Sequence, residues 1–189
     1  SLQYYPATLV LYAAGIAAIS KGSYSLLKLL LEDSIGKDFL QQDLIDEYPI
    51  WQVLNAMSCF PQEPEVFLPE GRRPTAGSDR IARQLRPIVN EVFGEDDEFD
   101  NLFDELELII ALVYANGSQN GFVAMGRFAR HPGPSPNERT PLSRMKRAIN
   151  EQKMNHPLLV AGMFGHDLER LKEALNRAWG FARQAIGRW

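Results

Sequence analysis

Cysteine and histidine are scarce in this sequence. Its 189 residues include one cysteine, Cys59, and three histidines, His131, His156 and His166. A single thiol cannot form an internal disulfide, and these few side chains cannot supply the usual Cys and His pattern of a zinc site. We therefore expect a fold that is held together by its core, without a metal or another cofactor.

Long apolar runs are missing as well. The longest, residues 4–19, is rich in Ala and Gly and is shorter than the roughly 20 residues that a membrane-spanning helix needs. Its small residues favour a buried helix that packs closely on a neighbour. We expect a cytoplasmic protein with no membrane contact.

Signals for β-strands are few, and the apolar residues instead recur with the spacing of helices. The expected helices are 6–21, 23–31, 38–48, 49–57, 78–93, 96–116, 140–153 and 167–186. Residues 157–164 suit either a short helix or a buried strand, and residues 122–128 suit a short strand. The prediction is an all-α fold, an irregular bundle of about seven to eight helices with long Pro-rich loops such as 59–77.

Three of these helices begin with residues that favour a helix N-terminus. Ser78 or Asp79, Thr140, and Asp167 can each cap the first turn that follows. Within helix 78–93 we expect a kink at Pro87, and we expect the inward residues Ile81, Leu85, Ile88, Val89 and Val92. The second half of helix 96–116 is apolar on all sides, which predicts the central buried helix.

Charge is distributed unevenly along the chain. The acidic region, residues 1–126, holds eight Lys and Arg against nineteen Asp and Glu, whereas the basic region, residues 127–189, holds twelve against five. Eight carboxylates lie between Glu95 and Glu107. We expect one helical domain over residues 1–189, excised from a larger protein, in which the acidic and basic regions pack together.

Basic residues are the main candidates for a binding site. A phosphate or nucleic-acid surface would use six of them, Arg127, Arg130, Arg139, Arg144, Lys146 and Arg147. Arg72 and Arg73, in the Pro-rich loop, are candidates for contact with an anion. The acidic pI of about 5.4 argues against nucleic acid, and the alternative is that the two charged regions face each other.

Catalytic patterns are absent from the sequence. It contains no Gly-rich phosphate loop with a Lys and no nucleophile-elbow motif. His166 and Asp167 are adjacent and could form a general-base pair of a hydrolase.

Four carboxylates, Asp97, Asp100, Asp104 and Glu107, share one helix face, but they lack the EF-hand spacing and a Glu-x-x-His motif. Acidic residues at a helix start favour the helix dipole, so we predict no metal site there.

One segment of the chain resembles a single tetratricopeptide-type unit. Gly22 and Tyr24 follow an Ala-rich helix, and Leu27, Leu30 and Leu31 come after them. The resemblance covers residues 11–31 and implies a helix pair with a capacity for peptide binding.

Three other stretches resemble helical regions appended to bacterial multidomain proteins, some of which carry sirtuin-like or ATP-binding domains linked to phage defence. They are residues 78–81 with 85–87, residues 102–107 and residues 126–128. The resemblance implies an accessory domain whose parent chain carries the chemistry. It assigns no catalytic residue to this segment.

These observations favour a non-enzymatic helical accessory domain of a larger bacterial protein. It would bind another domain of its parent protein, or a protein partner, through the 59–77 loop, the basic residues of 127–147 or the small-residue face of the first helix. Two alternatives remain open. One is a nucleic-acid-binding module that uses the basic residues of 127–147, and the other is a hydrolase with an unrecognised site near His166 and Asp167. The sequence does not determine the oligomeric state.

Overall fold

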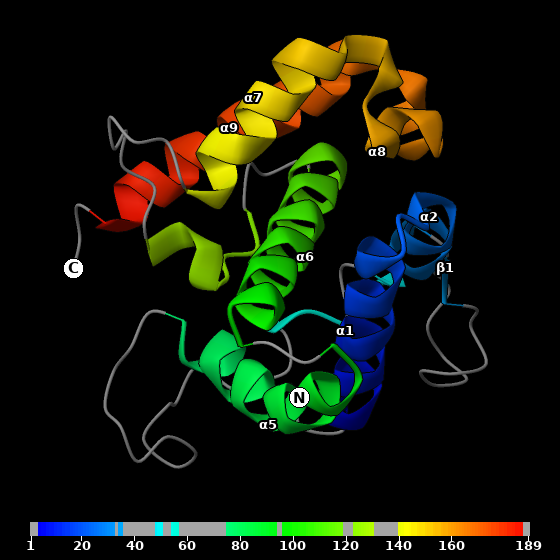
Figure 1. The fold of residues 1–189 in the computed structure, drawn as a ribbon. Helices are drawn as coiled ribbons and strands as arrows, with labels where there is room; N and C mark the ends of the chain where they lie inside the picture. Colours follow the sequence, from blue (N-terminus) through cyan, green and yellow to red (C-terminus); the bar gives the residue numbers. More distant parts are fainter. Residues whose placement is uncertain are drawn as a thin grey trace, which may run out of the picture.

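Helices dominate the residues that the computed structural model describes, which are 4–32, 34–35, 48–50, 54–56, 75–93, 96–118, 123–130 and 140–186. Seven α-helices occur there: α1 (Tyr5–Ser20), α2 (Tyr24–Glu32), α5 (Ala76–Phe93), α6 (Asp96–Gly117), α7 (Pro141–Gln152), α8 (Pro157–Val160) and α9 (Leu168–Ile186) (Figure 1). Three short 3-10 helices accompany them: η4 (Arg127–Arg130), η5 (Lys153–Asn155) and η6 (Met163–His166). The predicted all-α fold is confirmed.

A small antiparallel pairing joins β1 (Ser34–Ile35) to β2 (Tyr48–Pro49), with Ser34 opposite Pro49. The prediction of helix at Tyr48 and Pro49 was therefore wrong. A residue before proline is pushed towards extended backbone, and proline itself suits the end of an edge strand. The remainder of the predicted helix 38–48, residues 51–53 and 57 of the predicted helix 49–57, and most of the loop 59–77 lie outside the described residues.

Helix α6 is the centre of the molecule, as the sequence predicted. It contacts α1, α2 and α5 as well as η4, α7 and α9, and Figure 1 shows it running between α1 and the α7–α9 pair. All residues from Leu106 to Val113 are buried. Helix α6 of the acidic region thus packs against helices of the basic region.

The small residues of α1 allow it to approach α6 closely. A Cβ atom at Gly15 would lie 2.7 Å from Leu106 Cδ1, so a larger residue there would require the buried Leu106 side chain to shift. Gly15 and Ala18 of the small-residue face are therefore covered inside the fold, whereas Ala17 is exposed.

Two of the predicted N-terminal caps are confirmed. The Thr140 hydroxyl accepts a hydrogen bond from the Ser143 N–H at 3.2 Å, and Asp167 Oδ1 accepts from the N–H groups of Glu169 and Arg170 at 2.8 and 3.2 Å. Both contacts satisfy donors that a helix start leaves unpaired.

The start of α5 differs from the prediction. This helix begins at Ala76, so Ser78 lies buried in its first turn rather than at a cap. The buried stripe includes Ser78 and Leu85, which places Ile88 at its edge, 61% exposed and not inward as expected. The helix continues through Pro87.

Residues 123–128, the described part of the segment 122–128, do not form the expected strand. Residues 123–126 have no regular structure, and η4 follows at Arg127. The Arg127 N–H is donated to the side chains of Ser78 and Glu107, so it is not available to a strand partner. The segment 157–164, for which helix and strand were both open, forms α8 and the start of η6.

None of the helices described in the structure combines the length and the hydropathy that crossing a membrane requires.

Candidate functional site

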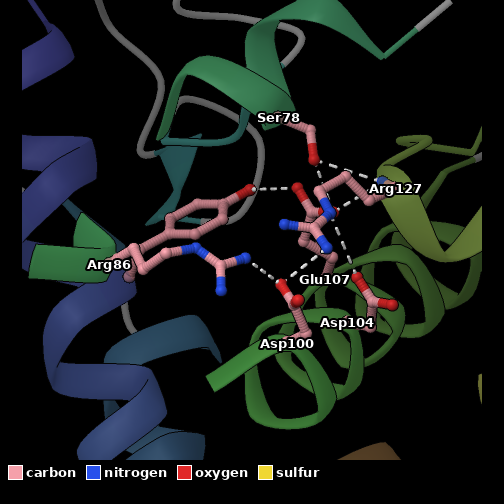
Figure 2. A network of polar contacts seen from close by, with 7 residues as sticks. Ser78, Arg86, Asp100, Asp104, Glu107 and Arg127 are labelled. Atoms are coloured by element: carbon pink, nitrogen blue, oxygen red, sulfur yellow. Dashed lines mark hydrogen bonds and ion pairs between the residues drawn. The ribbon is translucent and has the colours of Figure 1, made fainter. Parts of the chain in front are cut away.

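Glu107 is a buried carboxylate at which several elements of the fold meet. Its side chain is 3% exposed. Oε2 accepts hydrogen bonds from Ser78 Oγ of α5 and from the Arg127 N–H, both at 2.7 Å, and Oε1 accepts one from the Tyr12 hydroxyl of α1 at 3.4 Å. Figure 2 shows Ser78 and Arg127 converging on this carboxylate. The contacts tie α1, α5 and η4 to α6.

Arg127 also binds the acidic face of α6 through its guanidinium group. Its Nη2 lies 2.7 Å from Asp100 Oδ1, and its Nε lies 3.6 Å from Asp104 Oδ1. Arg86 of α5 binds the same Asp100 oxygen (Figure 2). Burial alone would raise the pKa of Asp100, but the hydrogen bonds from Arg86 and Arg127 outweigh it and hold that pKa below its ordinary value. Arg127, expected at a phosphate surface, is instead used inside the fold.

The surroundings of Glu107 decide whether it can be catalytic. Burial raises its pKa to about 7, against the hydrogen bonds from Ser78 and the Arg127 N–H, and the nearby charge of Asp104 adds to the rise. A carboxyl that titrates near neutrality suits general acid–base chemistry. The adjoining cavity, however, has a volume of only about 10 Å³, which is no more than one water needs. The network can hold elements together, but it leaves no space for a substrate.

A larger pocket lies between α2, α6, α7 and α8. Its volume is about 230 Å³. The apolar side of its lining includes Leu108 and Ile109 of α6, Met145 of α7 and Leu158 of α8, and the polar side includes Tyr24, Glu105, Arg144, Gln152 and His156. An apolar wall with a few polar groups is typical of sites for small ligands.

The polar groups of this pocket are only partly paired. The Tyr24 hydroxyl donates to Glu105 Oε1 at 3.3 Å, and Arg144 Nη1 donates to Asn101 Oδ1 at 3.0 Å. Burial raises the pKa of Glu105, while the hydrogen bond from Tyr24 and the charge of Arg144 oppose that rise. Burial, together with the charge of Glu105 and the hydrogen bond to it, raises the pKa of Tyr24 to about 12. Tyr24 is therefore a neutral donor, and Glu105 is easier to protonate than an exposed carboxyl.

Among the other predicted basic residues, the three whose side chains are described lie on α7 and have different surroundings. Lys146 lies over the Trp179 ring, Arg144 borders the pocket, and Arg147 is exposed on α7. Only the backbone of Arg130 is described, in η4. Arg139 and the loop pair Arg72 and Arg73 lie outside the described residues.

His166 and Asp167 both have roles in local structure. His166 is exposed, and its Nδ1 lies 2.8 Å from the Leu159 carbonyl oxygen. The Asp167 carboxylate caps α9. These contacts do not by themselves support a general-base pair.

Within the described residues, no three His, Cys, Asp or Glu side chains are arranged to hold a metal ion. Two of the four carboxylates that share a face of α6, Asp100 and Asp104, have arginine partners, and Glu107 has uncharged donors. The side chain of Asp97 lies outside the described residues.

Sequence reasoning missed the pocket residues Tyr24, Glu105 and His156, as well as the buried role of Ser78. One signal was available for Glu107, because it shares a helix face with Phe103 and Ile110, both of which are buried. No comparable signal brings Tyr24 and His156 to Glu105, since they are distant in sequence.

Comparison of the chain with protein-family models, curated proteins and solved structures found no match.

Proposed function

We propose that this chain is a non-enzymatic helical interaction domain that binds an acidic segment of another protein or of another domain of its parent protein. The binding surface, called here the basic surface, comprises Lys146 of α7 with Trp179 and Arg183 of α9. The observation that carries the proposal is the convergence of two cations on one ring. Lys146 Nζ lies 5.4 Å and Arg183 Cζ 5.9 Å from the centre of the Trp179 ring.

Two like charges beside one ring repel each other, so their arrangement favours a negatively charged partner. Both side chains are exposed, and neither forms an ion pair with a carboxylate of the described residues. Arg127 is the opposite case, because Asp100 and Asp104 balance its charge. Tryptophan and arginine are also the residues that most often dominate binding energy at protein interfaces.

A protein partner fits this surface better than a nucleic acid. The basic surface offers two cations, whereas nucleic-acid binding gains affinity with each phosphate that is neutralised. The whole chain has a net charge of −4, which repels a long polyanion. The proposal agrees with the role of a cytoplasmic accessory domain in a larger bacterial protein that the resemblance implies.

The test is a fluorescence-anisotropy titration with two labelled probes, a short peptide of alternating Glu and Ala and a single-stranded oligonucleotide of equal charge. We expect the peptide to bind at low salt and to bind at least about tenfold more weakly to the double variant Lys146→Glu/Arg183→Glu. The variant Lys21→Glu is the matched control. Lys21 is exposed in the turn between α1 and α2, and the charge change per site is the same.

Three outcomes contradict the proposal. In the first, the peptide fails to bind at low salt. In the second, Lys21→Glu weakens peptide binding by as much per charge changed as the double variant does. In the third, the oligonucleotide binds more tightly than the peptide and loses its affinity in the double variant. The last outcome establishes the nucleic-acid alternative.

A further inference from the structure

The pocket between α2, α6, α7 and α8 is too small for most cofactors. Its volume of about 230 Å³ lies just below the roughly 300–1,000 Å³ that is usual for ligand sites. A nucleotide or a folded peptide segment does not fit in that space. A ligand about the size of one amino acid does.

Two opposite charges border the pocket close to each other without forming an ion pair. Arg144 donates to Asn101, which is one helical turn from Glu105 on α6, and its charge acts on the Glu105 carboxyl. The only ionic or hydrogen-bonding partner of Glu105 within the described residues is Tyr24, so no Arg144 nitrogen is within ion-pair distance of it. A gap between unlike charges can accept a ligand that carries one charge of each sign.

His156 adds a hydrogen-bond donor to the pocket lining. The residue is 5% exposed and lines the pocket. Its Nδ1 accepts a hydrogen bond from the Leu158 N–H at 3.4 Å, and burial lowers its pKa. The neutral ring therefore carries its proton on Nε2, and no described residue accepts that proton. Nε2 is not one of the buried side-chain atoms that lack a partner, so it is accessible at the pocket wall and can donate to a ligand or to water.

From this arrangement we propose that the pocket binds a small zwitterion with an apolar body, of the class of a free apolar α-amino acid. Arg144 holds the ligand carboxylate, Glu105 holds the ammonium group, and the apolar wall around Leu108 and Met145 holds the side chain. His156 Nε2–H is a second donor at the pocket wall. This inference does not rest on the proposed binding of an acidic partner.

The two opposite charges at the pocket favour a zwitterion over a simple anion, a simple cation or a purely apolar molecule. A simple anion would pair with Arg144 but face the Glu105 carboxylate, and a simple cation would pair with Glu105 but face Arg144. A purely apolar molecule would leave both charges and the His156 donor unpaired. A zwitterion satisfies both charges, and its apolar side chain removes water from Leu108 and Met145.

The test is isothermal titration calorimetry of the full chain with L-leucine and L-phenylalanine. The comparison ligands are N-acetyl-L-leucine, which lacks the ammonium group, L-leucinamide, which lacks the carboxylate, and glycine, which lacks the apolar body. We expect leucine or phenylalanine to bind, and each comparison ligand to bind at least about tenfold more weakly.

Variants of the chain test the same contacts from the protein side. Glu105→Gln and Arg144→Gln should each weaken leucine binding about tenfold or more, and Ala148→Trp should abolish it by filling the pocket that Ala148 lines. Lys172→Gln is the control, because it removes one exposed charge of α9 outside the pocket lining. Circular dichroism confirms that each variant is folded.

The inference is overturned if neither amino acid gives a binding heat at millimolar concentration, or if N-acetyl-leucine or leucinamide binds as well as leucine. It is also overturned if Ala148→Trp binds leucine normally while folded. Lys146→Glu/Arg183→Glu should leave leucine binding unchanged, so a failure of this proposal and a failure of the proposed function are distinguishable.

Discussion

Glu105 and Glu107 lie two residues apart on α6 and face very different surroundings. Glu107 accepts hydrogen bonds from Tyr12, Ser78 and the Arg127 N–H and adjoins a cavity of about 10 Å³. Glu105 accepts one side-chain hydrogen bond, from Tyr24, and borders a pocket of about 230 Å³.

The difference separates a structural carboxylate from one that can bind a ligand. A buried polar group whose partners all come from the protein fixes the elements that carry those partners. A polar group with fewer partners and space beside it keeps the capacity to bind something else. The first description applies to Glu107 and the second to Glu105.

The largest expected effect is a difference in stability between two variants, each of which lacks one of the two carboxylates. Glu107→Ala should lower the free energy of unfolding by about 4 kcal/mol, because it leaves a cavity and takes the acceptor away from Ser78 and the Arg127 N–H. Glu105→Ala should lower it by about 1 kcal/mol, since only the Tyr24 hydroxyl loses its acceptor. Urea unfolding of both variants measures the difference. Equal losses would remove the distinction between the two sites.

The next effect is a dependence of stability on pH. The pKa of Glu107 is raised from 4.5 to about 7, so the folded state holds this proton more tightly than the unfolded state does. Protonation of Glu107 therefore stabilises the folded state fully below about pH 4.5, and this contribution is lost as the pH rises through about 7. The unfolding free energy of the wild-type chain relative to Glu107→Gln should therefore fall by about 3 kcal/mol over this range.

Urea unfolding of both proteins at several pH values measures that fall, and Glu105→Gln serves as the comparison. Its carboxyl also has a raised pKa but is less buried, so the same sign and a smaller change are expected. A relative stability that rises with pH would show that Glu107 is ionised in the folded protein at acidic pH.

A smaller effect tests how tightly the Glu107 site is closed. A Cβ atom at Gly126 would overlap with Glu107 Oε2. Gly126→Ala should therefore lower the free energy of unfolding by about 2 kcal/mol. Gly180→Ala is the control, because nothing lies within 4 Å of a Cβ at that α9 position. It should raise stability by up to about 1 kcal/mol through helix propensity. Thermal unfolding of both variants tests the pair, and a neutral Gly126→Ala would mean that the network adjusts readily.

Much of the fold could be predicted from short-range patterns. The apolar repeat of α6 and the caps Thr140 and Asp167 act within a few residues, and the structure confirms all three. One error arose where a distant contact overrode a local preference. The segment before η4 has strand-like residues, but the N–H of Arg127, with which η4 begins, is donated to Glu107.

The candidate sites were much less predictable. The sequence placed Glu107 on an acidic helix face and Arg127 in a basic segment, but it assigned each a separate role. Only the fold shows that Ser78, Glu107 and Arg127 meet, because these residues come from different elements. Arg144 was a candidate for phosphate binding, and the fold instead places it at a pocket with Glu105 and His156.

The sequence by itself determined the helical class of this protein, the central position of α6 and two helix starts, because hydrophobic periodicity and capping depend on neighbouring residues. The tertiary structure decided which charges are neutralised, which carboxylate is sealed and where a pocket opens. Those properties depend on burial and on distances between residues far apart in the chain, and only packing sets them.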